Sequence, residues 1–246
     1  MKKPFIFFGS ILLLSMVFFS CNKETATTGS DPDPIVSTSQ RSMSKVVPTG
    51  TQLLVRKWTE WVFTRDINLA PYDDATGAKQ YLGQPYTSGT MMLAGGNSPD
   101  LVSRAITINI GQYQSVFIPL INYFNYWNDC YPGNPVNNVP TGALSSVITE
   151  ALNGQRTLTL KWDGVSLLPE KLKDLRANSD FWEAPVHSSW DGGCVATSTT
   201  FYTDGFWAKV PLTLGVHTLE IAGDSDLRRF KSPFSNHVIY TITVVN

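Results

Sequence analysis

From Met91 onward the chain repeats one pattern, in which short apolar stretches are separated by turn-forming residues. Alternation such as Ile106-Thr107-Ile108 is what a strand with one buried face requires. We predict eight strands: Met91–Ala94, Ile106–Ile110, Ser115–Ile121, Thr157–Trp162, Val165–Leu168, Phe206–Leu212, Val216–Ala222 and His237–Val245. Because only two helices accompany them, βαβ units cannot alternate along the chain. The pattern therefore favours a mainly β fold, an antiparallel, jelly-roll-like β-sandwich with two short helices.

The first predicted helix begins at Thr51, a suitable N-cap, and carries Trp58 and Trp61 on a face that we expect to pack on the core. The second helix covers Thr141–Leu152 and stops at Asn153-Gly154. One or two further helical turns are expected between Glu170 and Arg176.

Three of the predicted strands carry local signals. Asp163-Gly164 is a two-residue turn that predicts a hairpin between the strands on either side of it. Pro119 cannot donate to a ladder, so its strand is expected to place it at an edge, an end or a bulge. The last strand, His237–Val245, alternates two sets of mostly apolar residues and is therefore expected to be buried on both faces.

The amino-terminal residues show a different pattern, an apolar run behind a cationic start. Met1-Lys2-Lys3 precedes the largely apolar stretch Phe5–Phe19, and Ser20-Cys21 follows directly. The run is shorter than the roughly 20 apolar residues that span a bilayer, and it has the organisation of a signal peptide. A small residue before cysteine resembles the cleavage site of a bacterial lipoprotein, of the phenylalanine-rich kind found in Bacteroidota. An ordinary secretory signal or an uncleaved anchor is the alternative.

This resemblance implies a signal peptide at residues 1–20. Composition and the strand pattern predict a tether at 21–50 and a single β-sandwich domain at 51–246. The resemblance also implies cleavage before Cys21, lipid including palmitate on that residue, and a place in the cell envelope as an outer-membrane lipoprotein, facing the periplasm or the cell surface. The tether is rich in Thr, Ser, Asp, Pro and Gly and has no aromatic residue, so it cannot offset its ordering entropy. The membrane is thus an expected partner through acyl chains alone.

The charge balance excludes one class of partner. Removing Lys2 and Lys3 from the 19 basic side chains leaves 17 against 20 acidic ones, a formal net charge of −3. Proteins that bind nucleic acid present a basic surface, which this composition does not supply. We therefore expect no nucleic-acid partner.

Lipid on Cys21 would leave two of the three cysteines, Cys130 and Cys194, as an even pair in an oxidising compartment. We predict a disulfide between them, which would close a loop of about 65 residues and contribute about 4 kcal/mol. Two separate buried thiols are the alternative, because the sequence does not fix the distance between their Cα atoms.

The segment from Asn122 to Pro140 is predicted to be a long loop, and its first part interleaves aromatic and amide side chains. Flat rings contact the apolar face of a ligand while amides orient its hydroxyl groups, which is the surface that a glycan binder needs. His187 and Trp190 could join this surface if the predicted disulfide forms. The alternative is that the loop fills itself with its own rings. The candidate ligand-binding residues are Tyr123, Tyr126, Trp127, Asn128, Tyr131 and Trp182.

Catalytic and metal sites have weaker support. Glu183 lies between apolar residues that could raise its pKa, and with Asp129 or Asp191 it could form the carboxyl pair of a glycoside hydrolase. A structural ion pair is the alternative for Glu183. The three histidines lack the close spacing of zinc ligands, so no bound metal is expected, with Ca²⁺ at Asp73-Asp74, or at Asp224 with Asp226, as a minor alternative.

Short motifs resemble an uncharacterised family of secreted bacterial proteins. They are Trp58-Thr59-Glu60-Trp61, Asp74-Ala75-Thr76-Gly77, Leu93-Ala94-Gly95, Arg104, Phe117-Ile118-Pro119-Leu120-Ile121-Asn122, Asp204-Gly205-Phe206-Trp207 and Leu214-Gly215-Val216-His217-Thr218-Leu219. The resemblance implies one exported β-rich domain and no particular activity. Three functions follow as hypotheses: a lipid-anchored binder of an extracytoplasmic ligand, with glycans favoured, a hydrolase using Glu183, and a non-catalytic accessory subunit of an envelope complex.

Overall fold

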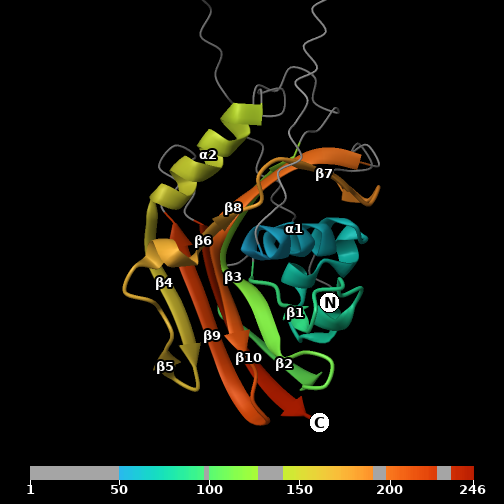
Figure 1. Cartoon of the computed structure of the whole chain (residues 1–246), viewed down its shortest axis with the longest axis vertical. Coiled ribbons are helices and arrows are strands. Elements are labelled where there is room, and N and C mark those ends of the chain that lie inside the picture. Colours follow the sequence, from blue (N-terminus) through green and yellow to red (C-terminus); the bar gives the residue numbers. More distant parts are fainter. Residues whose placement is uncertain (1–49, 97–99, 127–140, 191–197, 226–233) are drawn as a thin grey trace, which may run out of the picture. The chain divides into compact units, whose positions relative to one another are not determined.

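The computed structural model describes residues 50–96, 100–126, 141–190, 198–225 and 234–246. Two five-stranded sheets pack face to face, and helix α1 (Gly50–Phe63) covers the outer face of one of them (Figure 1). The predicted β-sandwich is therefore confirmed. The predicted signal peptide, nearly all of the tether and all three cysteines lie outside the described residues.

The first sheet, called sheet A, has the strand order β1-β3-β8-β6, with β7 also paired to β8. Only the β1–β3 pair is parallel. Its strands are β1 (Thr90–Met92), β3 (Ser115–Tyr126), β6 (Arg176–Asn178), β7 (Trp182–Pro185) and β8 (Ser198–Pro211).

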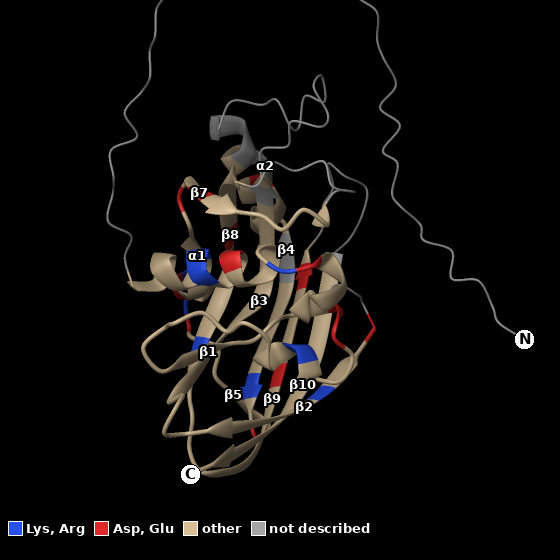
Figure 2. Cartoon of the chain, turned by 90° about the vertical axis from the view of Figure 1, so that its right-hand side faces the viewer, with Lys and Arg blue, Asp and Glu red and all other residues tan. Residues whose placement is uncertain are grey.

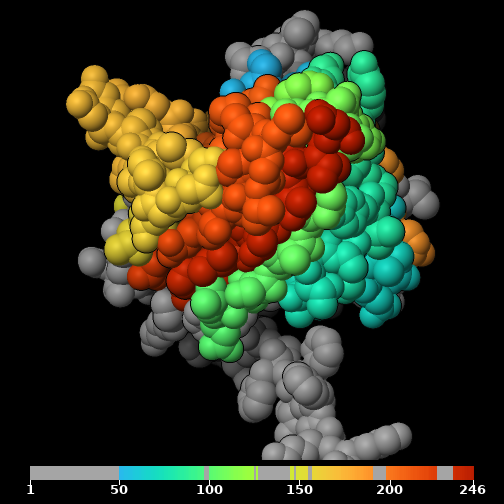
Figure 3. Space-filling model, turned by 90° about the horizontal axis from the view of Figure 1, so that it is seen from below, coloured from blue at the N-terminus to red at the C-terminus, as the bar shows by residue number. Residues whose placement is uncertain are grey.

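The second sheet, sheet B, has the order β2-β10-β9-β4-β5, and only β2 and β10 run parallel. Seen from below, β9, β10 and β2 lie side by side in orange, red and green (Figure 3). The sandwich is thus mixed, with one parallel pair in each sheet. The strands of sheet B are β2 (Val102–Asn109), β4 (Gln155–Trp162), β5 (Val165–Ser166), β9 (Gly215–Ser225) and β10 (Phe234–Val245).

A mainly aliphatic cluster, the aliphatic core, fills the space between the sheets. Helix α2 (Thr141–Asn153) adds Ile148 and Leu152 to it, close to β3 and β8. Its strand residues include Ile106, Ile108, Val116, Ile118, Leu120, Leu160, Val210, Leu219, Ile221, Val238, Ile242 and Val244.

A second cluster, the aromatic layer, lies between α1 and sheet A. Helix α1 buries one face at helical spacing, including both of the Trp residues that were expected to pack inward. Two rings of β8 meet this helix, Trp207 edge to face with Trp58 and Phe201 tilted against Phe63, and Trp182 of β7 packs on Phe201. The rings of the aromatic layer are Trp58, Trp61, Phe63, Phe117, Trp182, Trp190, Phe201 and Trp207.

A bulge in β3 decides which side chains reach the aromatic layer. The register with β8 shifts between Pro119 and Ile121, so Pro119 lies at a bulge, one of the predicted options. Before the bulge Ile118 faces the aliphatic core, whereas after it Phe124 and Tyr126 contact Phe63 of α1. One extra residue reverses the facing of all later side chains, which turns this aromatic series towards α1.

Several predicted elements change in the structure. The prediction of a loop from Asn122 was wrong up to Tyr126, because β3 continues there as the partner of β8. The prediction that the last strand is buried on both faces was also wrong: Val238 and Ile242 are buried, but Thr241 and Val245 on the other face are exposed. Strands β6 and β7 were not predicted. The Asp163-Gly164 hairpin was correct, with φ of 50° and 79° at its two residues.

Edge strand β2 is covered along its free side. Its Ala105 N–H donates to the carbonyl oxygen of Thr76 at 3.0 Å. The Tyr81 hydroxyl donates to the carbonyl oxygen of Thr107 at 3.1 Å and accepts from the N–H of the same residue. Tyr81 ends the 3₁₀ turn Ala78–Tyr81, and Thr76 lies just before that turn. Two further 3₁₀ turns, Ile67–Leu69 and Pro71–Asp73, precede them in the chain.

Two further features of the described residues concern possible contacts with a membrane or with nucleic acid. Within the described residues, no helix has the length and apolar character to cross a membrane. Acidic and basic positions are scattered along the ribbon of the described part of the chain in Figure 2.

Candidate ligand-binding site

A cavity of about 330 Å³ opens beside α1, where the far half of β3 meets the turns before and after β1. We call it the aromatic cavity. Its size falls at the lower end of the roughly 300–1,000 Å³ of small-molecule sites. It is lined by Trp58, Tyr72, Gly95, Gly96, Asn122, Tyr123 and Phe124.

The indole of Trp58 is held in place from two sides. Its Nε1–H donates to the carbonyl oxygen of Leu93 at 2.8 Å. Its ring meets Trp207 edge to face, with centroids 5.3 Å apart. Phe124 packs against Phe63 at 4.6 Å but keeps 37% of its surface exposed. The cavity thus has one fixed ring and one ring that is open to solvent.

The buried side-chain amide of Asn236 holds the Gly95-Gly96 pair in place by hydrogen bonding. Asn236 Oδ1 accepts from the Gly96 N–H at 2.5 Å, and its Nδ2 donates to Leu120 O of β3 at 3.0 Å. A Cβ at Gly95 would lie 2.7 Å from Asn236 Nδ2. Glycine at this position therefore lets the chain approach closely enough to form this wall of the cavity.

Two polar side chains that line the cavity, Asn122 and Tyr72, are uncommitted. Among the described residues, neither the Asn122 amide nor the Tyr72 hydroxyl forms a side-chain hydrogen bond. Burial, with the nearby charge of Asp73 as a smaller cause, raises the pKa of Tyr72 to about 12. The Tyr72 hydroxyl therefore stays protonated at neutral pH and can donate or accept, while Asn122 can do both.

A buried polar hub stands behind the cavity. The Arg104 guanidinium donates from Nη1 to Ala94 O at 2.7 Å, to Gly95 O at 3.2 Å and to the Tyr240 hydroxyl at 2.7 Å. It also donates to the carbonyl oxygens of Asp74 and Tyr72, at 2.5 and 3.0 Å. Since these acceptors belong to the turns that border the cavity, the hub fixes two of its walls.

Asp74 belongs to the same hub. Its carboxylate accepts from the backbone N–H groups of Thr76, Gly77 and Lys79 at 2.8–3.0 Å, and from the Gln80 amide at 3.3 Å. Burial alone would raise the pKa of Asp74, but these bonds outweigh it and lower that pKa. Both oxygens face N–H donors, which suits an anchored turn better than a Ca²⁺ ligand.

The structure brings only part of the predicted binding set to this cavity. Tyr123 lines it, but Tyr126 packs between Phe63 and Phe201, at 5.6 and 5.5 Å. Trp182 is 7% exposed, and its Nε1–H donates to Glu60 Oε1 at 3.3 Å. Trp127, Asn128 and Tyr131 lie outside the described residues, as do Asp129, Asp191 and Asp226.

The other predicted residues that the structure describes do not line the cavity, although the Trp190 ring packs 6.2 Å from the ring of Tyr72. Trp190 is buried, 4.4 Å from Phe63, and donates to Arg65 O at 3.0 Å. His187 Nδ1 bonds the Ser189 hydroxyl at 2.9 Å. Glu183 is exposed on β7, whereas its neighbours Trp182 and Ala184 are buried on the opposite face.

Trp58, Tyr72 and the Gly95-Gly96 pair were missed as site residues. They come from segments that are distant in sequence and meet only through tertiary packing. The one usable signal was the glycine pair directly after a predicted strand, which often marks close backbone approach.

One further arrangement resembles a catalytic triad. His217 Nδ1 lies 2.8 Å from Asp163 Oδ2, and its Nε2 lies 3.1 Å from the Thr213 hydroxyl. However, Nε2 also lies 3.0 Å from the Thr213 carbonyl oxygen, which can only accept. The Asp163 carboxylate and the Thr213 carbonyl oxygen can only accept, and the bond to Asp163 is the main cause of a raised His217 pKa. His217 thus connects the turn at Asp163 with the segment around Thr213.

Metal ligands do not gather in the described part of the chain, where no group of three or more His, Cys, Asp or Glu residues could hold an ion. No protein-family model, curated protein or solved structure matches this chain. The fold and the cavity therefore define the molecule as a β-sandwich with an aromatic-lined pocket, and its function has to be argued from that pocket.

Proposed function

We propose that this chain is a lipid-anchored protein of the bacterial cell envelope that binds an extracytoplasmic glycan in the aromatic cavity. The observation that supports binding is the lining of this cavity, where aromatic side chains stand next to the uncommitted Asn122 amide and Tyr72 hydroxyl. Ring faces contact the C–H faces of a sugar, and amide and hydroxyl groups orient its hydroxyls.

Binding without hydrolysis is favoured by the chemistry of the lining. Glycoside cleavage canonically uses two carboxyl groups about 5 to 9.5 Å apart. No Asp or Glu is among the described residues that line the cavity, and the exposed Glu183 is not one of them. A sugar held there would meet apolar and neutral polar groups only.

The anchoring part of the proposal is supported by the sequence pattern that ends at Ser20-Cys21. Acyl chains on Cys21 would hold the chain at the outer membrane. Metabolic labelling with palmitate should mark the protein and should leave Cys21→Ser unmarked. An unlabelled wild-type chain, or an unchanged membrane fraction for Cys21→Ser, would remove this part of the proposal.

The binding experiment is a glycan array probed with the full chain, followed by titration of the retained glycan. Asn122→Ala and Phe124→Ala should each weaken binding about tenfold, because each removes a ligand contact worth about 1.4 kcal/mol. Asn122→Ala keeps the Cβ against which Gly205 packs, so its fold should persist.

The matched control is Tyr86→Ala, which removes a ring that is 91% exposed and does not line this cavity. It should leave glycan retention unchanged. Unchanged retention in Asn122→Ala and Phe124→Ala at unchanged melting temperature, or no glycan retained by the wild type, would reject the glycan site.

A further inference from the structure

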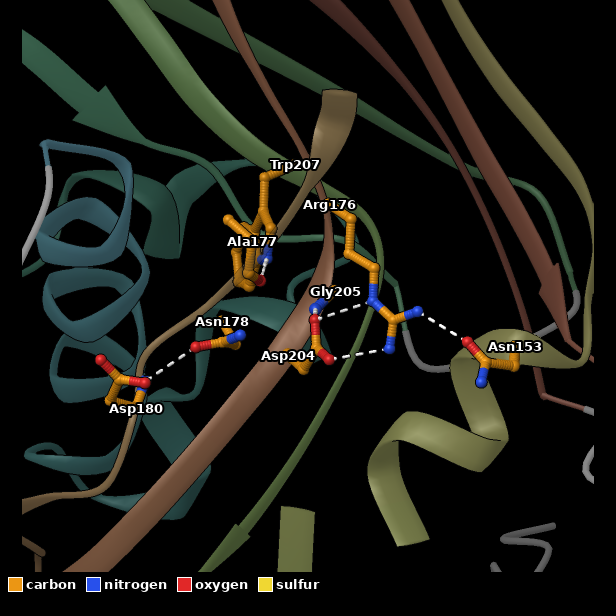
Figure 4. A network of polar contacts seen from close by, with 8 residues as sticks. All are labelled: Asn153, Arg176, Ala177, Asn178, Asp180, Asp204, Gly205 and Trp207. Carbon is orange, nitrogen blue, oxygen red and sulfur yellow. Dashed lines mark hydrogen bonds and ion pairs between the residues drawn. The ribbon is translucent and has the colours of Figure 1, made fainter. Parts of the chain in front are cut away.

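A second cleft, of about 480 Å³, lies on the α1 face of sheet A between α1 and β6. Its apolar lining includes Phe117 and Trp207, whose rings stack with centroids 5.2 Å apart and an interplanar angle of 4°. The Trp207 Nε1–H donates to Ala177 O of β6 at 3.1 Å, which fixes the pair below the cleft (Figure 4). The two rings are 1% and 3% exposed, so they form a packed base under the cleft, and the half-buried Leu54 and Leu175 border it above them.

The wall on the β6 side is held by a polar network. Arg176 binds Asp204 through two bonds, at 2.9 and 3.3 Å, and its Nη1 donates to Asn153 Oδ1 of α2 at 2.7 Å (Figure 4). Asp204 is 2% exposed, so this ion pair is largely desolvated. Arg176 is committed to this network and is not a free cation for a ligand.

Two opposite charges that line the cleft are uncommitted. Lys209 on β8 and Asp174 in the turn Leu172–Leu175 are both exposed. Among the described residues, neither side chain forms a hydrogen bond or an ion pair, with the other or with a third group. The Asn178 amide accepts from the Asp180 N–H at 3.1 Å, and its N–H₂ group has no recorded acceptor in the described residues.

We infer that this cleft is a second binding site, for a small zwitterion with an apolar side chain, namely a free amino acid or a short peptide. Its carboxylate would pair with Lys209, its ammonium group with Asp174, and its side chain would lie against Leu54 and Leu175. A cation and an anion that share one cleft without pairing match a ligand that carries both charges. A neutral glycan would satisfy neither charge, so this site is distinct in chemistry from the aromatic cavity.

The test is calorimetric titration of the full chain with the dipeptide leucyl-leucine, its N-acetyl form and its C-terminal amide. The unblocked dipeptide should bind, and each blocked form should bind about fivefold more weakly, the loss expected for one ion pair near a surface. Lys209→Gln should cost the unblocked dipeptide the same factor and leave the amide unaffected. Asp174→Asn, which removes the partner of the ammonium group, should also weaken binding of the unblocked dipeptide about fivefold. It should leave binding of the N-acetyl form unaffected.

Two matched controls change an equal charge outside the cleft: Lys173→Gln, next to Asp174, and Glu183→Gln on β7. Both should bind all three ligands like the wild type. The inference is overturned if leucyl-leucine shows no saturable binding, if the three forms bind equally, or if the controls weaken binding as much as the cleft variants. None of these outcomes depends on whether a glycan binds in the aromatic cavity.

Discussion

The aliphatic core and the aromatic layer are built on opposite faces of the same sheet, yet they differ in what they leave open. Between the sheets, branched side chains such as Ile118 and Ile221 are fully buried. Between α1 and sheet A, rigid rings meet at centroid distances of 4.4–5.6 Å and varied angles. Both cavities described above border these rings. Aliphatic packing holds the fold, and aromatic packing against a single helix provides apolar walls with hollows between them.

The largest effect is expected from Arg104→Ala, because Arg104 connects the two regions. Its removal takes the guanidinium donor from the carbonyl oxygens of Asp74, Gly95 and Tyr72. The Ala94 carbonyl oxygen keeps only its bond from the Tyr240 hydroxyl. We expect a loss of about 4 kcal/mol in the free energy of unfolding, measured by urea denaturation. Arg56→Ala, which loses one bond to Ser179 O, should cost about 1 kcal/mol. Equal losses for the two variants would show that the hub does not link the regions.

Somewhat smaller losses of stability are expected from one substitution in the aliphatic core and one beside the aromatic layer, and they allow the two regions to be compared directly. Ile118→Ala leaves a void in the aliphatic core and should cost about 3 kcal/mol without weakening glycan binding. Phe124→Ala, at a ring that is 37% exposed, should cost about 1 kcal/mol and weaken binding. Unfolding curves and glycan titrations of both variants check this, and a reversed order of the two stability losses would break the comparison.

The smallest expected effect is a pH dependence of the free energy of unfolding, which comes from Asp74 in the hub around Arg104. The pKa of Asp74 is lowered in the folded state, so its contribution is present above its unfolded pKa of about 3.9 and is lost as pH falls through the folded value. Wild type should be more stable than Asp74→Asn at pH 6, and the difference should shrink below pH of about 4. Urea unfolding of both proteins at pH 6 and below pH of about 4 tests this prediction. A stability difference that stays constant with pH would exclude the Asp74 carboxylate as the source of that difference.

How far the sequence predicted this molecule depended on how local each signal was. The Asp163-Gly164 hairpin was predictable because its turn needs only two residues with positive φ. The helix at α1 followed from the spacing of its buried residues. Strands β6 and β7 are three and four residues long and carry no alternation long enough to recognise.

The site was less predictable than the fold for a related reason. The aromatic and amide series after Pro119 was recognised, but the bulge in β3 hid that it continues a strand and faces α1. Tyr123 was therefore a named candidate, and Asn122 and Phe124 fell within the predicted segment, whereas Trp58 and Tyr72 were not recognised. Their meeting depends on the hub around Arg104, and no spacing in the chain encodes that hub.

The covered edge of β2 affects how copies of this protein can pair with one another at high local concentration. An exposed edge strand has unpaired N–H and C=O groups with which a strand of another chain can pair, and such pairing leads to aggregation. Here Thr76 and the Tyr81 phenol occupy the bonding positions of Ala105 and Thr107. Copies crowded together on one surface would thus find these two bonding positions at the β2 edge already occupied.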